Sequence, residues 1–494
     1  MAVALTLFLL LLFCISSPTA RAAEDEQEYM VVAMSSLHPQ DACSGHRVSP
    51  LQNATGMNWM PLHFPHGPCS SPSAVAAQTA GHAAPSSSLV DDLLLWDELR
   101  ADGIQRRLPP GSMANRPRAP SDQTFITNSV QQQPAAKAPL GTASRGGQRA
   151  SQLSIAIDPT ATGGGGGVPG VVQTVVLDTA SDVPWVQCVP CPVPPCHAET
   201  DTVYDPTTSP TYAAFPCSSP ACARLGPYAN GCVNNQCQYR VVYPDGSTTS
   251  GTYSSDVLTL TPTAAIRSFQ FGCSHADQGN FDNTTAGILA LGGGAESLVS
   301  QTAAKYGDTF SYCVPPTASY FGFFALGMAR AESRYAVTPM LRYPQVPTFY
   351  RVLLRDIAVG GRRLGVPAPA FAAGAVLDTR TVFTRLPPTA YRALRAAFRS
   401  GMRRYRPAPP RGAFDTCYDL TGAGAVRLPR VALVFDRNTV VELDPAGILF
   451  NGCLAFVPNA DDRMPGILGN LQLRTIEVLY DISRGLVGFR RGAC

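Results

Sequence analysis

Residues 175–182 read VVLDTASD: an apolar, β-branched run ends in an Asp-Thr pair, and a small residue and a Ser follow it. Two hundred positions later, residues 375–382 read AVLDTRTV and repeat the pattern. A single acid at the end of a strand often serves as a helix cap or a turn residue. Two acids that share the same apolar approach and the same following Thr instead indicate a duplicated site, with Asp178 and Asp378 as its halves.

The duplication extends beyond the two acids. Residues 287–292 read GILALG and residues 466–470 read GILGN, so each acid is followed far downstream by an apolar segment that begins with Gly. Gly at such a position lets a second strand pass closely against the loop that carries the acid. Four matching segments in the same order predict two related lobes.

The composition indicates a mainly β chain with more than one domain. A length of 494 residues suggests about two or three domains. The 44 Pro and 43 Gly, with 15% charged residues, favour turns and short strands over long helices. The net charge of +3 and the scattered Arg residues give no basic stripe, so no nucleic-acid partner is expected. Short apolar runs between turn residues predict strands at 171–177, 239–243, 251–260, 266–273, 350–354 and 431–435.

Two segments, 89–108 and 388–403, have helical spacing. In the first, apolar residues recur about every three or four positions, and Arg100, Arg106 and Arg107 lie between them. This segment has two interpretations. It is either a surface helix of no special role, or a propeptide helix whose Arg residues reach acids in the mature domain.

The N-terminal region predicts export. Residues 1–15 are apolar and the triplet ARA at 20–22 is a small-x-small cleavage site, which together are typical of a signal peptide over 1–22. The alternative, a membrane anchor, needs a longer apolar run. Residues 131–139 have the composition of an exposed linker. The five Gly at 163–167 lack a following Gly-Lys-Ser/Thr, so we interpret them as a flexible connection rather than a phosphate-binding loop.

The cysteines support the same compartment. Without Cys14 of the signal peptide, 14 of the 15 cysteines remain, 12 of them between residues 188 and 494, and an even set in an exported chain predicts disulfides. The spacings C-x2-C-x4-C from Cys188 and C-x4-C from Cys232 also fit zinc ligands, but a second Cys-x2-Cys pair is missing, so disulfides are favoured. Asn53 and Asn283 begin glycosylation triplets.

Together these segments resemble the pepsin-like aspartic proteases of the plant nepenthesin type over residues 148–494. Further matches are WVQC at 185–188, the flap-like YPDGS at 243–247, the Cys-rich insertion and the ending VLYD at 478–481. The resemblance implies a mainly β, bilobal fold with two barrel-like lobes and the active-site cleft between them. The implied parts are a signal peptide (1–22), a propeptide and linker (23–148), an N-terminal lobe (149–330) and a C-terminal lobe (331–494).

The resemblance also implies roles for individual residues. Asp178 and Asp378 are the expected catalytic pair, which shares one proton because two facing carboxylates do not both ionise easily. The ionised acid activates a water, and its protonated partner polarises the scissile carbonyl, without metal, cofactor or covalent intermediate. The other implied roles are cross-bracing by the hydroxyls of Thr179 and Thr379, hydrogen bonds from Ser181 and Thr381 to the outer carboxylate oxygens, a flap carrying Tyr243, and a disulfide between Cys417 and Cys453.

Three positions depart from the family pattern. Ala180 and Arg380 stand where the family has Gly after each Asp-Thr, and Pro244 stands where it has Gly after the flap Tyr. Ala180 is expected to cost about 1–3 kcal/mol if its dihedral is unfavourable. The charge of Arg380 beside the pair would favour ionisation of both acids and remove the proton that the mechanism needs. Pro244 is expected to stiffen the flap tip.

Three functional hypotheses follow. The first is a secreted aspartic endopeptidase. The second is a catalytically impaired binding or inhibitor protein, similar to the plant xylanase inhibitors built on this fold. The third is a structural wall or storage protein. Because both acids, both Thr and the flap Tyr are present, the enzyme is favoured. We expect a monomer without a membrane anchor that acts on polypeptides in the extracellular space (apoplast), with the vacuole as the alternative.

Overall fold

The computed structural model describes residues 28–33, 58–63, 87–108, 152–157, 170–261, 264–281, 285–315, 322–327 and 335–494. The predicted signal peptide, the linker, the Gly run, Cys14 and both glycosylation triplets' Asn residues, Asn53 and Asn283, lie outside these residues. No helix in the described ranges combines the length and apolar character needed to cross a bilayer.

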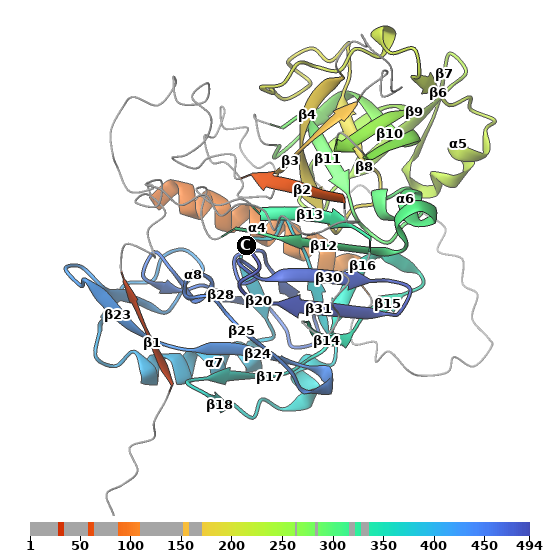
Figure 1. Ribbon diagram of the computed structural model, residues 1–494. Coiled ribbons are helices and arrows are strands. Elements are labelled where there is room, and N and C mark those ends of the chain that lie inside the picture. The colour runs from red at the N-terminus through yellow and green to blue at the C-terminus, as the bar shows by residue number, and fades with distance from the viewer. Residues whose placement is uncertain are drawn as a thin grey trace, which may run out of the picture.

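The prediction of a mainly β, bilobal fold is confirmed (Figure 1). One long sheet runs through the N-terminal lobe and continues between the lobes. Its strands, in spatial order, are β14 (Ala336–Pro339), β31 (Leu486–Arg490), β30 (Glu477–Asp481), β12 (Thr309–Cys313), β13 (Gly322–Leu326), β2 (Asn58–His63), β3 (Gln152–Ile157), β4 (Val171–Asp178), β11 (Gly287–Ala290), β5 (Trp185–Gln187), β10 (Ala264–Gln278), β9 (Thr248–Thr261), β8 (Gln236–Val242) and β7 (Ala229–Val233), with β6 (Ala213–Ala214) paired to β9.

In the described part of the C-terminal lobe, three smaller sheets have four strands or more. The first contains, in spatial order, β15 (Leu341–Tyr343), β16 (Val346–Val352), β19 (Ala375–Leu377), β29 (Gly466–Leu468), β20 (Thr384–Leu386) and β28 (Phe456–Pro458). The second contains, in spatial order, β18 (Arg362–Arg363), β17 (Leu354–Val359), β24 (Val431–Phe435) and β25 (Thr439–Glu442). The third contains, in spatial order, β21 (Arg406–Ala408), β22 (Cys417–Asp419), β27 (Cys453–Leu454) and β26 (Leu449–Phe450).

The repeated segments occupy equivalent places in the two lobes. In each lobe the strand that leads to the acid lies parallel to the strand with the GIL sequence: β4 pairs with β11, and β19 pairs with β29. The GIL strand then pairs antiparallel with the strand that follows the acid, β5 in the first lobe and β20 in the second. Gly287 is required by close approach, because a side chain there would overlap the backbone of Trp185. The predicted duplication is therefore present in the topology.

Among the described residues, five α-helices accompany the sheets. They are α4 (Ser87–Arg107), α5 (Pro220–Arg224), α6 (Leu298–Tyr306), α7 (Pro388–Gly401) and α8 (Pro445–Ile448). The two helices predicted from apolar spacing correspond to α4 and α7. The apolar face of α7, with Tyr391, Leu394 and Phe398, packs into the core of the C-terminal lobe. Helix α4 instead lies across the space between the two lobes (Figure 1).

A short N-terminal strand extends the C-terminal lobe. Strand β1 (Tyr29–Ala33) pairs antiparallel with β23 (Ala425–Pro429) over its whole length. Val32 of β1 is buried in the main core, and the guanidinium of Arg427 lies 4.0 Å from the ring centre of Tyr29. In the described part of the chain, β23 has no other strand as a neighbour.

The predicted disulfides are confirmed for the cysteines after residue 187, including the pair Cys417–Cys453 that the resemblance implied. A second bond, Cys313–Cys494, fixes the C-terminal residue to strand β12. Four bonds lie in the N-terminal lobe: Cys188–Cys273, Cys191–Cys196, Cys217–Cys232 and Cys222–Cys237.

Candidate active site

The two repeated acids meet at the interface of the lobes. Asp178 is the last residue of β4, and Asp378 follows β19 directly, so each lobe delivers one carboxylate from a buried apolar strand. Both side chains are fully buried, with 0% of their surface exposed. The sequence therefore predicted correctly which two acids lie together.

The two Thr residues bind the loops to each other. The hydroxyl of Thr179 donates to the carbonyl of Leu377 (3.0 Å) and accepts the N–H of Thr379 (3.1 Å). The hydroxyl of Thr379 donates to the carbonyl of Leu177 (2.7 Å) and accepts the N–H of Thr179 (3.2 Å). This reciprocal set matches the cross-bracing expected from the resemblance, and it fixes the two carboxylates relative to each other.

The two carboxylates have different neighbours. Asp378 Oδ2 accepts hydrogen bonds from the hydroxyl (2.6 Å) and the N–H (3.1 Å) of Thr381, as expected. The role expected of Ser181 is not seen, because its buried hydroxyl has no hydrogen-bond partner within the described residues. Asp178 Oδ2 instead faces Nη1 of Arg380 at 3.4 Å. The guanidinium thus lies where the resemblance had placed the Ser hydroxyl.

The backbone tolerates the residues that replace Gly. Neither Ala180 nor Arg380 has a positive φ, so the strain considered for Ala180 does not arise from a left-handed conformation. The N–H of Ala180 donates to Asp178 Oδ1 at 2.8 Å, and the N–H of Arg380 faces Asp378 Oδ1 at 3.4 Å. The amides that bond the carboxylates are therefore available without Gly.

The segment predicted as a flap forms a tight turn after β8. The N–H of Tyr243 donates to the carbonyl of Ser247 (2.8 Å), and the N–H of Gly246 donates to the carbonyl of Tyr243 (3.0 Å). Trp185 Nε1 donates to the Tyr243 hydroxyl at 2.6 Å. The guanidinium of Arg380 lies 5.3 Å from the centre of the Tyr243 ring. The turn therefore closes over the side of the site that carries Arg380.

Helix α4 places a cation on both acids. Arg100 Nε and Nη2 each donate to Asp378 at 2.7 Å, to Oδ2 and Oδ1 respectively, and Nη2 also donates to Asp178 Oδ1 at 2.8 Å. Burial by itself raises the pKa of Asp378, but the charge and hydrogen bonds of Arg100, followed by those of Thr381, hold it below its ordinary value. Of the two interpretations of this helix, the structure supports an Arg that reaches acids of the main domain, but only for Arg100: Arg106 is exposed, and Arg107 donates to the carbonyl of Val242.

A second charged residue of α4 binds main-chain groups beside the pair. Both oxygens of Asp97 accept the N–H of Val382, at 2.8 and 3.1 Å, and Oδ2 also accepts the N–H of Phe383 at 2.8 Å. Burial raises the pKa of Asp97 to about 7, although these backbone hydrogen bonds oppose the rise. Helix α4 thus engages both the carboxylates and the amides next to them.

Apolar contacts hold α4 on both sides of the pair. Leu94 packs with Phe383 and Phe414 of the C-terminal lobe. Nearer the C-terminal end of the helix, Ala101, Ile104 and Leu108 pack in a cluster with Ala180, Tyr343, Phe349, Val376 and Ile467. Burial of the Leu94, Ile104 and Leu108 side chains contributes about 1.5–3 kcal/mol each, so the helix is held by packing as well as by charge.

Close packing between α4 and the flap turn requires Gly103. A side chain at this position would overlap the backbone of Pro244. One helical turn further on, Arg107 Nη2 donates to the carbonyl of Val242 at 2.6 Å. The flap turn therefore rests directly on the helix.

Gly103→Ala is expected to loosen α4. The added methyl favours helix by about 1 kcal/mol, but overlap with Pro244 costs about 1–3 kcal/mol, as overpacking does in other cores. Limited proteolysis of the precursor at neutral pH should cut the variant within α4 faster than the wild type. Glu98→Ala, on the exposed face of the same helix, is the matched control and should not change the rate. Equal rates for Gly103→Ala and the wild type would contradict the prediction.

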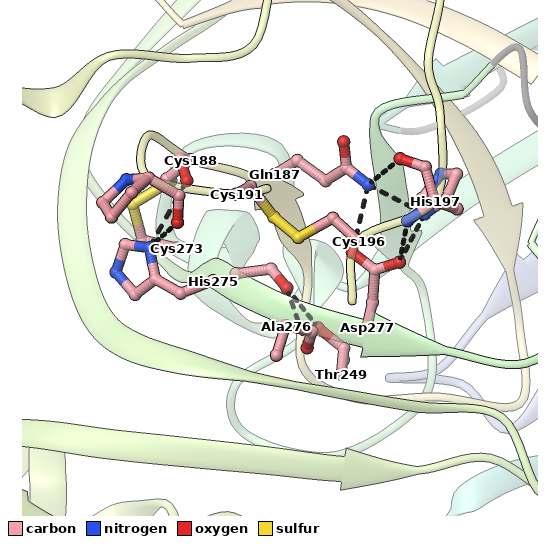
Figure 2. The surroundings of a disulfide bond; sticks show 12 residues. Gln187, Cys188, Cys191, Cys196, His197, Thr249, Cys273, His275, Ala276 and Asp277 are labelled. Atoms are coloured by element: carbon pink, nitrogen blue, oxygen red, sulfur yellow. Dashed lines mark hydrogen bonds and ion pairs between the residues drawn. A yellow bond between two sulfur atoms is a disulfide. The ribbon is translucent and has the colours of Figure 1, made fainter. Parts of the chain in front are cut away.

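The zinc interpretation of the first cysteines does not hold, because their sulfurs are joined in disulfides. Cys191 and Cys196 lie beside Asp277, but both sulfur atoms are in one bond (Figure 2). Asp277 instead binds His197: its Oδ1 lies 2.5 Å from Nδ1, and the other ring nitrogen lies 2.8 Å from the carbonyl of Thr285. Gln187 Nε2 also lies 2.8 Å from Nδ1. Because an acceptor oxygen faces each ring nitrogen, the ring fits best as a doubly protonated imidazolium.

This arrangement predicts a pH-dependent stability. Burial lowers the pKa of His197, but its hydrogen bond and charge interaction with Asp277 outweigh burial, so the pKa is raised overall. A raised folded-state pKa stabilises the fold at low pH, and this contribution is lost as the pH rises through the raised value. Burial also raises the pKa of Glu199, to about 7, so Glu199 likewise lowers the stability of the fold as the pH rises.

His197→Gln should therefore reduce the fall in thermal stability between about pH 6 and 9, by about 1.4 kcal/mol for each unit of raised pKa. Thermal unfolding across this range measures the effect. His275→Gln is the matched control, because His275 Nδ1 faces the backbone carbonyls of Cys188 and Pro190, both at 3.3 Å, rather than a carboxylate. The same pH profile in His197→Gln and the wild type would contradict the assignment.

Comparisons with known proteins extend over most of the chain. The family models described as xylanase inhibitor N-terminal and C-terminal match residues 165–328 and 349–491. An aspartyl protease family protein of Arabidopsis thaliana is 32% identical over 482 residues, 96% of this chain and 94% of the relative. Aspartic proteinase nepenthesin-2 of Nepenthes gracilis is 30% identical over 345 residues, 66% of this chain and 76% of the relative. Conglutin gamma, a basic 7S globulin from lupine seeds, superposes with a TM-score of 0.55 at 21% identity, covering 69% of this chain and 92% of the globulin. This match shows a similar fold.

Proposed function

Because this chain belongs to the pepsin-like aspartic protease family of plants, we propose that it is the precursor of a secreted aspartic endopeptidase whose active site is closed by helix α4. The observation that carries the proposal is the contact of Arg100 with both Asp178 and Asp378 at 2.7–2.8 Å. The guanidinium fills the place between the acids, and α4 covers the flanking apolar surfaces. The substrate is a polypeptide, and the processed enzyme acts as a monomer.

The chemistry needs only the two acids and a water. One carboxylate, ionised, takes a proton from the water as it attacks the scissile carbonyl, and the protonated partner hydrogen-bonds the carbonyl oxygen and then supplies the proton to the leaving amine. The Thr179 and Thr379 hydrogen bonds keep the carboxylates in register through this exchange. The flap turn with Tyr243 excludes bulk water from the bound peptide.

Helix α4 supplies the latency. Arg100 carries a charge at any physiological pH and favours the ionised form of the acids, whereas catalysis needs one of them protonated. Docking of α4 lowers the pKa of Asp378. Asp378 therefore favours docking at pH values above its ordinary pKa, and this contribution is lost as the pH falls through the lowered pKa. Asp97, with a pKa of about 7 when docked, favours docking below that pH. Strong acidification is therefore the signal proposed to release the helix, after which residues 23–148 are removed as a propeptide.

The proposed location rests on the predicted signal peptide and on the disulfides. Six disulfides among the described residues fit a chain that folds in an oxidising compartment. We propose the extracellular space, with the vacuole as the alternative destination of the same secretory route.

Arg380 favours a second candidate, a protease-fold protein that binds a polypeptide without cutting it. Its guanidinium stays 3.4 Å from Asp178 Oδ2 after Arg100 is gone, if the local structure is retained. A cation at this distance favours ionisation of the pair. In that case Arg380→Gly should raise the cleavage rate, and an unchanged or lower rate would reject an inhibitory role for Arg380.

The proposed activity is tested with the purified precursor. The protein is acidified between about pH 2.5 and 6 and mixed with a denatured protein substrate, with and without pepstatin. Pepstatin-sensitive cleavage, together with a fall in precursor mass, is expected. If no pepstatin-sensitive cleavage appears anywhere in this range, the endopeptidase proposal fails and the binding protein is the better interpretation.

A further inference from the structure

Five charged side chains gather at the centre of the molecule. Each exposes less than a tenth of its surface, the largest value being 8% for Asp245. Two are guanidinium groups and three are carboxylates, contributed by α4, by the flap turn and by both acid loops. The five residues are Arg100, Arg380, Asp178, Asp378 and Asp245.

Asp245 lies in the flap turn and faces Arg380. Its Oδ1 accepts the N–H of Ser247 at 3.0 Å, whereas its buried Oδ2 accepts no hydrogen bond within the described residues. Nη2 of Arg380 lies 3.8 Å from this oxygen. Nη1 of the same guanidinium lies 3.4 Å from Asp178 Oδ2. Arg380 thus spans the distance between the flap and the acid pair.

The number of charges depends on whether α4 is present. With α4 docked, two guanidinium groups face three carboxylates. When α4 leaves with Arg100, Arg380 alone faces Asp178, Asp378 and Asp245. If Asp245 is ionised, its charge balances that of Arg380, and the acid pair keeps the single negative charge and single proton that the mechanism uses. If Asp245 were neutral, the charge of Arg380 would be unbalanced. It would then favour ionisation of both acids, and the pair would lose the shared proton.

We infer that Asp245 is a positioning residue for the acid pair: by pairing with Arg380, it makes an Arg compatible with catalysis at a position that the family fills with Gly. The inference rests on the proposed endopeptidase function and deepens it. The pair also joins the flap to the C-terminal lobe, because Asp245 is two residues from Tyr243 while Arg380 is two residues from Asp378.

Other titratable groups also surround the acid pair and Arg380. The phenol of Tyr243, under the Arg380 guanidinium, accepts the Trp185 N–H, and burial raises its pKa well above the ordinary value, so it stays neutral in the working range. Arg100 also acts electrostatically on Asp245, and this influence ends when α4 leaves. Further groups among the described residues that act electrostatically on the two acids or on Tyr243 include Asp97, Asp182, Arg107, Tyr239, Tyr312 and Tyr480.

The test is a pair of single variants and their combination, measured as pH–rate profiles of the processed enzyme. Asp245→Asn leaves Arg380 unbalanced and should move the pH optimum down by about one unit. Arg380→Gly leaves Asp245 unbalanced and should move the optimum up. The double variant should return close to the wild-type optimum. Failure of Asp245→Asn to move the optimum down, or of the second substitution to restore it, would overturn the inference.

The same cycle at an exposed pair is the matched control. Arg463 and Asp461 form an ion pair at 2.6 Å, with 79% and 38% of their side chains exposed. Asp461→Asn and Arg463→Gly make the same two substitutions in an exposed ion pair instead of a buried one. Alone and together, they should leave the pH optimum unchanged. A shift in these variants comparable to the shift in Asp245→Asn would show that the effect is not specific, and would overturn the inference.

A stability measurement separates this inference from the proposed function. In the unprocessed precursor, the thermal midpoint should fall in both Asp245→Asn and Arg380→Gly, and the double variant should fall by less than the sum of the two. Independent, additive losses would overturn the pairing even in an active enzyme. A wild-type protein that cleaves nothing would end the proposed function, whereas non-additivity in the precursor would still establish the pair.

Discussion

Arg100→Gln in the full-length precursor is expected to produce cleavage of a denatured substrate at mildly acidic pH, without prior loss of the N-terminal region. Arg100 is the α4 side chain whose atoms contact both acids, at 2.7–2.8 Å. Its loss leaves the pair able to take up the shared proton, and it weakens the docking of α4. Substrate cleavage measured within the first minutes after acidification, before the precursor mass changes, reports this effect.

The same variant should be less stable. Removing one partner of a buried ion pair leaves the other charge unbalanced, which typically costs about 3–5 kcal/mol. Arg106→Gln is the matched control, because Arg106 lies on the same helix but is exposed. The control should remain latent and keep its thermal midpoint. A precursor with Arg100→Gln that is as latent and as stable as the control would contradict the role given to Arg100.

Asp178→Asn and Asp378→Asn should abolish cleavage to the same extent but differ in their effect on α4. Each variant removes one member of the pair that exchanges protons with the water and the substrate, so a loss of about 10³-fold or more is expected. Arg100, however, donates two of its hydrogen bonds to Asp378 and one to Asp178. Asp378→Asn should therefore release α4 more readily.

Peptide-bond cleavage and limited proteolysis of α4 measure these two effects separately. Thr381→Ala is a useful companion, since it removes a hydrogen bond to Asp378 Oδ2 but keeps both carboxylates. It should retain measurable cleavage. Residual pepstatin-sensitive cleavage in Asp178→Asn or Asp378→Asn would contradict the catalytic assignment, and equal protease sensitivity of α4 in the two variants would contradict the unequal sharing of Arg100.

The sequence allowed the fold and the acid pair to be predicted because both depend on local patterns that occur twice. An apolar run before Asp-Thr becomes a buried strand that ends in an acid, and the parallel GIL strand is required beside it. Helix α4 could also be predicted, since apolar spacing depends only on neighbours a few positions away. Asp97, Arg100 and Ile104 follow that same spacing, and this could have distinguished Arg100 from the exposed Arg106.

Contacts between distant segments could not be predicted in the same way. The contact of Gly103 with Pro244 depends on where the helix docks, and no local pattern carries that information. The pairing of Asp245 with Arg380 requires knowing that the flap turn lies over the second acid loop. The expectation for Ser181 was wrong for a related reason, because the long side chain of Arg380 reaches across the lobe interface to the oxygen that Ser181 was expected to bond.

The pairing of β1 with β23 has a consequence for solubility after the proposed processing. If residues 28–33 are removed with the rest of the N-terminal region, β23 loses its one strand partner among the described residues, and unpaired strand edges recruit strands from other molecules. This edge is only five residues long and ends at Pro429, which has no N–H to offer, while Arg427 places a charge on its exposed face. Short length, Pro and charge are the features by which natural edges resist association. The N-terminal strand therefore covers an edge that is already protected against aggregation when the strand departs.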